Sequence, residues 1–178
     1  MQLAALELFE ERGYDGTTVA DIAARAGLTE RTFYRHYSDK REVLVSGSAE
    51  LAALLARTIA AQPDGTAPLA SVVAALDAAG ELFDARRPFS MRRQAVVEAS
   101  RDLREREFAK LEALTTTLTE ALTERGVDAR QAVLVANVGV SLFHVAFGRW
   151  IRDPGGREFA MFVHEALEDL QDAVPVAP

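Results

Sequence analysis

The 178-residue chain contains no cysteine, which excludes disulfide bonds and thiolate metal ligands. It also lacks the short motifs of common enzymes: there is no HExxH pair, no glycine-rich phosphate loop and no nucleophile elbow. The three histidines, His36, His144 and His164, fall on three different predicted helices. His144 and His164 could in principle meet and hold a metal, but ordinarily packed histidines are commoner. We therefore expect no enzyme activity, no metal and no cofactor.

Strand-forming patterns are scarce as well. Alternating β-branched and aromatic residues are few, whereas alanine and leucine recur at helical spacing. The chain is 49% hydrophobic and 26% charged, which is typical of an ordinary soluble protein. No basic and hydrophobic signal sequence opens it. The composition predicts an all-α protein in the cytoplasm.

The net charge of −7 disfavours nucleic-acid binding at first sight, because lysine and arginine contacts to phosphate dominate that affinity. The distribution of charge matters more than its sum. Between Thr29 and Arg41 the basic residues exceed the acidic ones by two, with Arg31, Arg35, Lys40 and Arg41 against Glu30 and Asp39. A dimer would present this basic segment twice, while its acidic remainder faced solvent.

Two short helices are predicted around this basic segment. Thr18 can cap a first helix, with Asp21 as its capping-box partner, and Gly27 ends that helix. Thr29 can cap a second helix that runs from Glu30 to about Tyr37. Two short helices joined by a tight glycine turn are typical of a helix-turn-helix, whose second helix enters the DNA major groove.

The same stretch closely resembles the N-terminal domain of TetR-family transcriptional regulators. The matching features, in chain order, are Leu8-Phe9, Gly13, Gly16-Thr17-Thr18, Ile22-Ala23, Ala26-Gly27, Thr32-Phe33-Tyr34, His36-Tyr37 and Lys40. The resemblance implies a homodimeric, all-helical regulator, usually a repressor, that leaves DNA when a small molecule binds its C-terminal domain. Family members usually carry a basic arm before this point, so either the natural start lies upstream or the arm is absent.

The resemblance also implies which residues contact DNA. It places base-facing positions at Glu30, Arg31, Thr32, Tyr34, Arg35 and His36, with Ala20 on the preceding helix. Arginine is well suited to guanine O6 and N7, so Arg31 is the strongest candidate for reading a base. Glu30 could accept from cytosine N4 or simply favour the helix N-terminus. We expect phosphate contacts from Thr18, from Lys40 and from at least one of Tyr34 and Tyr37, which could alternatively pack against the first helix.

The predicted organisation is a three-helix helix-turn-helix domain over residues 1–46 and a ligand-binding and dimerisation domain over residues 47–178, with about nine helices in all. One continuous helix, capped by Asp39 and running to about Ile59, is expected to link the two domains. Residues 62–68, QPDGTAP, form the clearest linker. Further helices are expected over residues 69–86, 89–100, 103–125, 131–148 and about 159–170.

The predicted helix over residues 131–148 carries no charged residue and reaches the lower edge of the length that spans a membrane. Asn137, Ser141 and His144 interrupt its apolar surface, so we reject a membrane span. An apolar helix can instead place one face in the core and another against a partner subunit. The resemblance implies that this helix and the last one pair with their copies in a four-helix dimer interface.

A ligand site can be predicted only by type. Asn137, Ser141 and His144 share one face of their helix, and such convergent polar groups orient ligands in apolar pockets. Aromatic walls could come from Phe83, Phe89, Phe147 and Trp150, which favours a mainly apolar effector. Alternatively, the same polar face lies in the dimer interface. Arg92 and Arg93 could meet an anionic group at the mouth of the pocket.

The resulting prediction is a TetR-like repressor that binds a near-palindromic operator as a homodimer and is released by a small, mainly apolar effector. One alternative is an effector-independent architectural DNA-binding protein with a filled C-terminal domain. Another is a ligand carrier or small enzyme that does not use its helix-turn-helix domain, residues 1–46, here called the headpiece. Such a protein would bind no DNA even at low salt.

Overall fold

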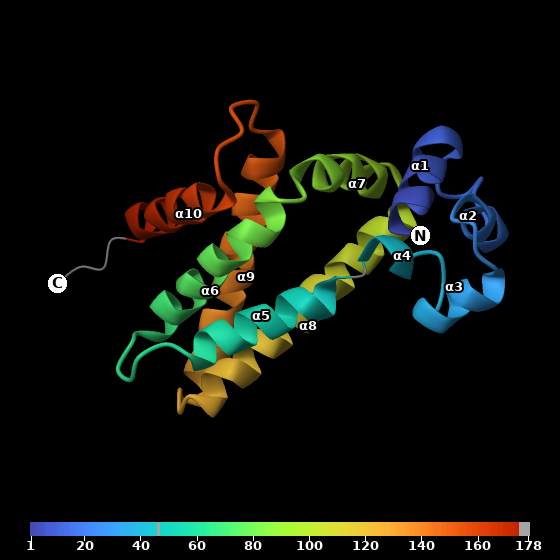
Figure 1. Ribbon diagram of the computed structural model, residues 1–178. Coiled ribbons are helices and arrows are strands. Elements are labelled where there is room, and N and C mark those ends of the chain that lie inside the picture. The colour runs from blue at the N-terminus through green and yellow to red at the C-terminus, as the bar shows by residue number, and fades with distance from the viewer. Residues whose placement is uncertain (46, 175–178) are drawn as a thin grey trace. The chain divides into compact units, whose positions relative to one another are not determined.

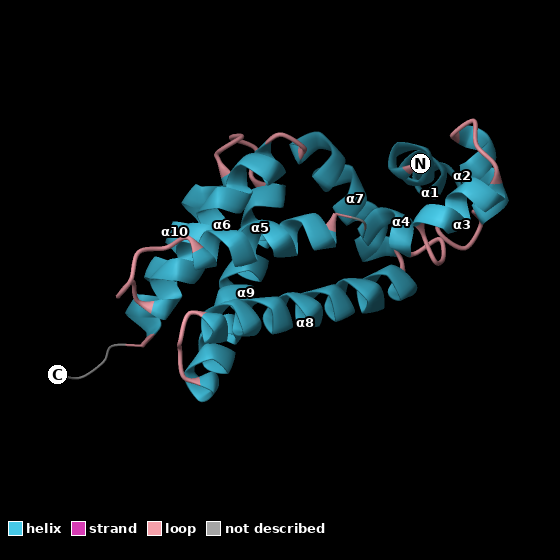
Figure 2. Cartoon of the chain, turned by 60° about the horizontal axis from the view of Figure 1, so that its bottom comes forward, coloured by secondary structure: helices cyan, strands magenta, loops and turns pink. Residues whose placement is uncertain are grey.

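The computed structural model describes residues 1–45 and 47–174, and within these ranges it contains helices and loops but no strand (Figures 1 and 2). The all-helical prediction is confirmed. The helices are α1 (Gln2–Arg12), α2 (Val19–Arg25), α3 (Glu30–His36), α4 (Glu42–Val45), α5 (Ser48–Ala60), α6 (Pro68–Asp84), α7 (Arg87–Ala99), α8 (Arg101–Glu124), α9 (Ala129–Arg152) and α10 (Phe159–Ala173).

The helices form two compact units. Unit 1 contains residues Met1–Ser48 together with Pro88–Lys110, and unit 2 contains Ala49–Arg87 together with the chain from Leu111 onward. Helix α7 and the first half of α8 therefore pack with the headpiece, although sequence order alone assigned them to the C-terminal domain. The predicted boundary after Ser46 falls on a residue outside the described ranges.

The single helix predicted from the Asp39 cap to Ile59 is wrong in one respect. The structure has two helices in its place, α4 and α5, on either side of Gly47. Gly47 has a φ of +104°, a backbone conformation that only glycine adopts readily and that does not continue a right-handed helix. The hydrophobic spacing of the two segments is helical on both sides, so the pattern alone did not reveal the break.

The core of unit 1 joins the headpiece helices to α7 and α8. Leu6, Phe9, Ile22 and Phe33 of the headpiece are buried in one cluster, to which α4, α7 and α8 add Val43, Leu44, Val96, Val97 and Leu103. Thr17 is also buried, and its hydroxyl hydrogen-bonds to the carbonyl oxygens of Leu8 (3.2 Å) and Gly13 (2.9 Å). The segment between α1 and α2 is thereby fixed to the end of α1.

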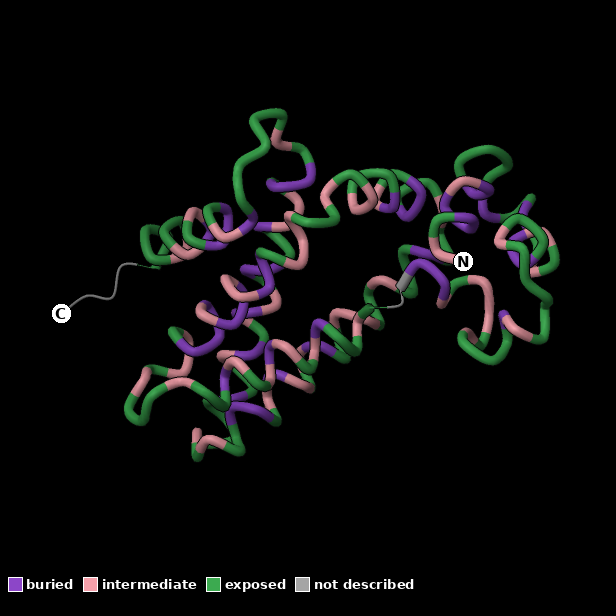
Figure 3. Tube along the Cα trace, in the orientation of Figure 1, coloured by how far each residue is buried: buried purple, intermediate pink, exposed green. Residues whose placement is uncertain are grey.

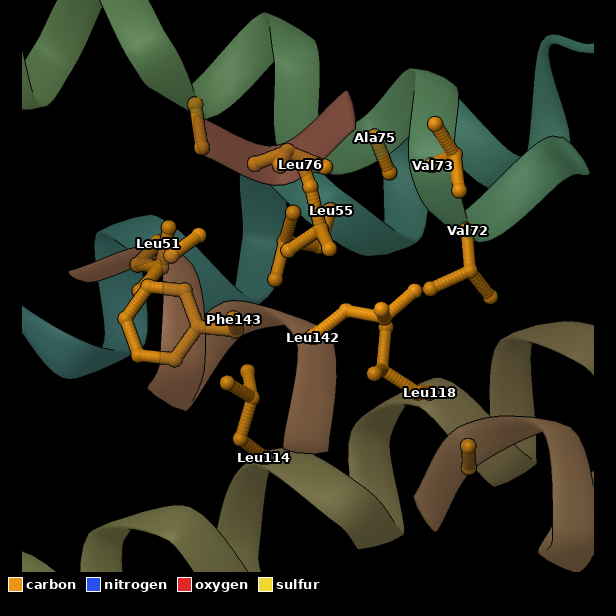
Figure 4. Close-up of a cluster of buried hydrophobic side chains, with 14 of the residues drawn as sticks. Leu51, Leu55, Val72, Val73, Ala75, Leu76, Leu114, Leu118, Leu142 and Phe143 are labelled. Atoms are coloured by element: carbon orange, nitrogen blue, oxygen red, sulfur yellow. The ribbon is translucent and has the colours of Figure 1, made fainter. Parts of the chain in front are cut away.

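The core of unit 2 gathers apolar side chains from five helices. Figure 4 shows Leu51 and Leu55 of α5, Leu76 of α6, Leu118 of α8 and Phe143 of α9 within this cluster. Helix α9 also packs closely on α6, because a Cβ on Gly139 would lie 2.5 Å from Cγ1 of Val72. Buried and exposed residues alternate with helical period along these helices (Figure 3), as their sequence spacing predicts.

Candidate nucleic-acid interface and effector site

The helix-turn-helix is built by local capping. Thr18 Oγ1 accepts from the Asp21 N–H (3.1 Å), and the Thr18 N–H donates to Asp21 Oδ2 (2.9 Å), so the predicted capping box is present. Thr29 Oγ1 accepts from the Thr32 N–H (3.2 Å) at the start of α3. Gly27, with a φ of +68°, makes the turn between the two helices. These contacts set α3 on α2 in the arrangement that the sequence pattern predicts.

One face of α3 is anchored and the opposite face is free. Phe33 is completely buried, and its ring contacts those of Tyr34 (5.6 Å between centroids) and Tyr37 (5.3 Å). The candidate base-reading residues Glu30, Arg31, Arg35 and His36 are exposed, Tyr34 is 55% exposed and Thr32 is half-buried. Ala20 on α2 is exposed as well. The burial of Phe33 therefore turns this polar set toward solvent.

The basic residues of the segment differ in how they are paired. Arg41 is bound to Asp39 by ion pair (2.6 Å), which also lowers the pKa of that carboxyl. Within the described ranges, no acidic side chain lies at ion-pair distance from Arg31 or Arg35. The two arginines of this segment that have no ion-pair partner among the described residues are thus both on α3, the helix expected to enter the major groove.

The candidate phosphate contacts have partners inside the protein. Lys40 Nζ donates to the carbonyl oxygens of Tyr14 (2.8 Å) and Thr17 (3.1 Å) and lies 4.1 Å from the centre of the Tyr14 ring. The exposed Thr18 hydroxyl donates to Asp21 (2.6 Å), and Tyr37 is half-buried against Phe33. Lys40 therefore braces the α1–α2 segment, in addition to any contact with DNA.

Three of the four predicted aromatic wall residues come together in unit 2. Phe83, Phe147 and Trp150 pack with Phe143 and Phe159, with ring centroids 4.9–6.1 Å apart. The Trp150 indole N–H donates to Asp84 (2.9 Å), so its polar atom is satisfied inside the cluster. These rings fill space against one another. The fourth residue, Phe89, packs on the core of unit 1.

The predicted polar ligand contacts lie on the outer face of α9. Asn137, Ser141 and His144 are all exposed, and the first two hydrogen-bond to carbonyl oxygens one turn earlier in their own helix. His144 borders an open hollow of about 520 Å³ whose lining includes Val145, Arg149 and Phe162. The polar face of α9 and the aromatic cluster are therefore on different sides of the helix.

Residues 3–46, which contain the helix-turn-helix, match the sequence model of the tetR family of bacterial regulatory proteins. The HTH-type transcriptional regulator TcmR of Streptomyces glaucescens is 30% identical over 131 residues, covering 70% of this chain and 58% of TcmR. Residues 3–46 are a TetR-family DNA-binding domain. The negative regulator of the biofilm operon icaADBC, IcaR of Staphylococcus epidermidis, is 44% identical over 39 residues, or 22% of this chain and 21% of IcaR. The chain thus spans less than two thirds of either relative.

Solved structures of TetR-family proteins share the fold. Thermus thermophilus FadR, a transcriptional repressor in complex with lauroyl-CoA, is 26% identical with a TM-score of 0.60, over 99% of this chain and 94% of FadR. Bacillus subtilis FadR, in complex with stearoyl-CoA, is 19% identical with a TM-score of 0.62, over 97% of both chains. The second comparison supports the fold alone. Both extend the likeness beyond the headpiece to nearly the whole chain.

Helices α7 and α8 make polar contacts to this TetR-family headpiece that hydrophobic spacing did not predict. Arg92 binds Glu10 of α1 (Nε–Oε1 2.9 Å), and Arg106 forms an ion pair with Glu42 of α4. Arg93 donates from Nε to the Leu44 carbonyl oxygen of α4 (2.6 Å). In the sequence, the adjacent arginines Arg92 and Arg93 were the one visible sign of these contacts. Its partners lie about 50 to 80 positions away, so no local pattern could identify them.

Proposed function

We propose that the protein is a homodimeric transcriptional repressor that binds a near-palindromic operator and is released by an amphipathic effector with a long apolar chain. The observation that carries DNA binding is the exposed polar face of α3, with Arg31 and Arg35 lacking acidic partners among the described residues. Helix-turn-helix dimers place two such helices in successive major grooves, which requires a two-fold related site.

The homodimer is supported by the outer surface of α9 and α10. Leu134 is 66% exposed, and Val133 and Val145 of α9 and Met161 of α10 are also exposed. By length and composition alone α9 could cross a membrane, with a mean hydropathy of 1.5 over a window that is 33% buried. In the proposed dimer a second copy of the chain covers this apolar face. The exposed Asn137 and Ser141 then lie in the same interface, where polar groups of the second copy can hydrogen-bond to them. A dimer therefore accounts for α9 without a membrane.

The effector class rests on the apolar interior of unit 2 and on the likeness to Thermus thermophilus FadR, whose structure holds lauroyl-CoA. An effector that binds the DNA-free conformation more tightly than the DNA-bound one weakens operator binding, and operator DNA weakens effector binding by the same factor. Because Phe83, Phe147 and Trp150 fill their cluster, a ligand that entered there would have to displace these rings.

The first experiment is binding to the DNA that flanks this protein's own gene, followed by fluorescence anisotropy at two salt concentrations with scrambled competitor. Specific binding that weakens steeply with salt supports the proposal. The double variant Arg31→Ala/Arg35→Ala should lose this binding, and Arg57→Ala, which removes an exposed arginine on α5, should retain it. A chain that binds no DNA at low salt would instead be a carrier with an unused headpiece.

A further inference from the structure

Unit 1 contains a buried group of three charged side chains in which two cations share one carboxylate. Arg93 of α7 is only 7% exposed, and its guanidinium forms an ion pair with Glu107 of α8. One turn further along α8, Lys110 Nζ lies 3.4 Å from the other oxygen of the same carboxylate. The Lys110 side chain is 19% exposed. The group therefore carries one uncompensated positive charge in a largely desolvated position.

This surplus is costly, because burying a charge without a partner is strongly unfavourable. The Lys110 ammonium has three N–H donors but a single acceptor within the described ranges, and that contact is longer than an ordinary hydrogen bond. Burial and the adjacent Arg93 lower the pKa of Lys110, against the opposing attraction of Glu107. The ammonium is thus short of negative charge and of acceptors at the same place.

Other basic residues of α7 and α8 in unit 1 are paired or exposed. Arg92 is paired with Glu10, Arg106 with Glu42 and Arg101 with Glu105. Arg104 has no ion pair within the described ranges, but it is exposed and donates to the Glu98 carbonyl oxygen. The buried surplus is therefore confined to Arg93 and Lys110, and one added anion would neutralise it. A carboxylate or phosphate group supplies both the missing charge and the missing acceptor oxygens.

Arg93 also connects this cluster to the headpiece. Its Nε donates to the carbonyl oxygen of Leu44, a buried residue of α4, and α4 follows the recognition helix α3 in the chain. A guanidinium is planar and rigid, so the donors on Nε and Nη2 cannot reorient independently. An anion that draws Arg93 away from Glu107 would therefore also disturb the hydrogen bond that holds α4.

We propose that Arg93 and Lys110 receive the anionic group of the effector, a carboxylate or phosphate, within unit 1, and that Arg93 transmits its binding to α4. That this anion belongs to an effector rests on the function proposed above, whereas the need for an anion follows from the cation surplus in unit 1. A free fatty acid and an acyl-CoA both carry this chemistry, and the choice of probes separates them.

The test uses isothermal titration calorimetry of the full chain with laurate, lauroyl-CoA and uncharged dodecan-1-ol. Wild type should bind at least one anionic probe about tenfold or more tightly than dodecan-1-ol. Lys110→Met should reduce that preference to below about threefold, with an unchanged or higher Tm because the surplus charge is gone. Arg101→Gln removes an exposed arginine from the same helix and should preserve the preference. If laurate binding weakens in Lys110→Met, the site binds a carboxylate. If only lauroyl-CoA binding weakens, the site binds the phosphates of the CoA group.

The link to α4 is tested with Arg93→Lys, which keeps the charge but cannot contact Glu107 and Leu44 in the same forked geometry. This variant should bind the anionic probe with less than a fivefold loss, yet the probe should no longer release it from operator DNA. Release equal to that of wild type would overturn the link.

The anion site itself is overturned if Lys110→Met retains the full preference, if its Tm falls by several degrees, or if wild type prefers neither anionic probe. Operator binding by the unliganded wild type, measured in parallel, tests the DNA-binding function separately. Specific DNA binding without any preference for an anionic probe would therefore contradict the anion site and leave the proposed DNA-binding function supported.

Discussion

Arg31 and Arg35 differ from neighbouring arginines in their ion pairing. Arg25 is paired with Glu7 and Glu11 across α2 and α1, and Arg41 is paired with Asp39. In each of these ion pairs a carboxylate neutralises the arginine, whereas the α3 arginines have no such partner among the described residues. Since arginine binds guanine through two parallel hydrogen bonds, an unpaired arginine at the start of a recognition helix suits base reading.

Replacing Arg31 by alanine should relax operator specificity at one base pair, at a cost of about 1 to 3 kcal/mol, because one bidentate base contact is lost. The measurement compares affinities for operators substituted at each position. Arg57→Ala serves as the control, since it removes an exposed arginine from α5. A uniform loss across all operator sequences would assign Arg31 to the phosphate backbone instead.

Lys40 holds two backbone carbonyl oxygens between α1 and α2, a role separate from contact with phosphate. Lys40→Ala should destabilise this segment by about 1.5 to 3 kcal/mol, the range for hydrogen bonds to a charged donor. Faster amide hydrogen exchange at residues 14–18 would report that loss.

The same variant should weaken binding to all sequences alike and reduce the salt slope by about 1 if the ammonium also contacts phosphate. An unchanged slope combined with faster exchange would leave Lys40 as a brace of the headpiece and remove it from the DNA-contact set. An unchanged exchange rate would contradict the bracing role.

At the scale of elements, the contact between α6 and α9 depends on the absence of a side chain at Gly139. An added Cβ would approach Cγ1 of Val72 to 2.5 Å, closer than real carbon contacts allow. Gly148 lies on the same helix, but there the nearest atom is the Arg152 Nη1 at 3.4 Å, the end of a flexible side chain. Substituting each glycine by alanine therefore distinguishes the effect of packing, at Gly139, from the effect of helix propensity, at Gly148.

Gly139→Ala should lower the stability of unit 2 by about 1 to 3 kcal/mol through overpacking. Gly148→Ala should be neutral or gain up to about 1 kcal/mol, because alanine is the better helix former. Urea unfolding followed by the fluorescence of Trp150, the single tryptophan, measures both at one protein concentration. Equal effects of the two substitutions would show that the α6–α9 contact tolerates the added methyl group.

At the scale of the whole molecule, the proposed homodimer places the exposed apolar face of α9 between the two copies, so the proposed operator binding depends on this face. Leu134→Glu places a charge on this face and should convert the dimer to a monomer, with loss of tight operator binding because each headpiece then binds a half-site alone. Analytical ultracentrifugation and anisotropy measure the two effects.

Met91→Glu is the matched control, because Met91 is an exposed apolar residue of α7 in unit 1. It should leave both the dimer and operator binding intact. A Leu134→Glu protein that remains dimeric would exclude this face of α9 from the interface.

Local patterns were sufficient to predict most helices and the helix-turn-helix. The capping box of Thr18, the cap at Thr29, the turn at Gly27 and the inward Phe33 all depend on residues within a few positions of one another, and all are present as predicted. The break at Gly47 was missed because apolar residues recur at helical spacing on both sides of it. A single glycine is compatible with either outcome until its neighbours pack.

The sequence by itself determined the helical class and the helix-turn-helix, because these follow from short-range spacing and capping, and the resemblance of the headpiece to TetR-family regulators was visible in the same residues. Only the tertiary structure decided that α7 and the start of α8 pack with the headpiece. It also decided that Asn137, Ser141 and His144 lie outside the aromatic cluster, and that Arg93 joins Glu107 to Leu44. The physical reason is that burial and ion pairing between distant segments depend on which helix faces meet, and amphipathic spacing is the same for many such partners.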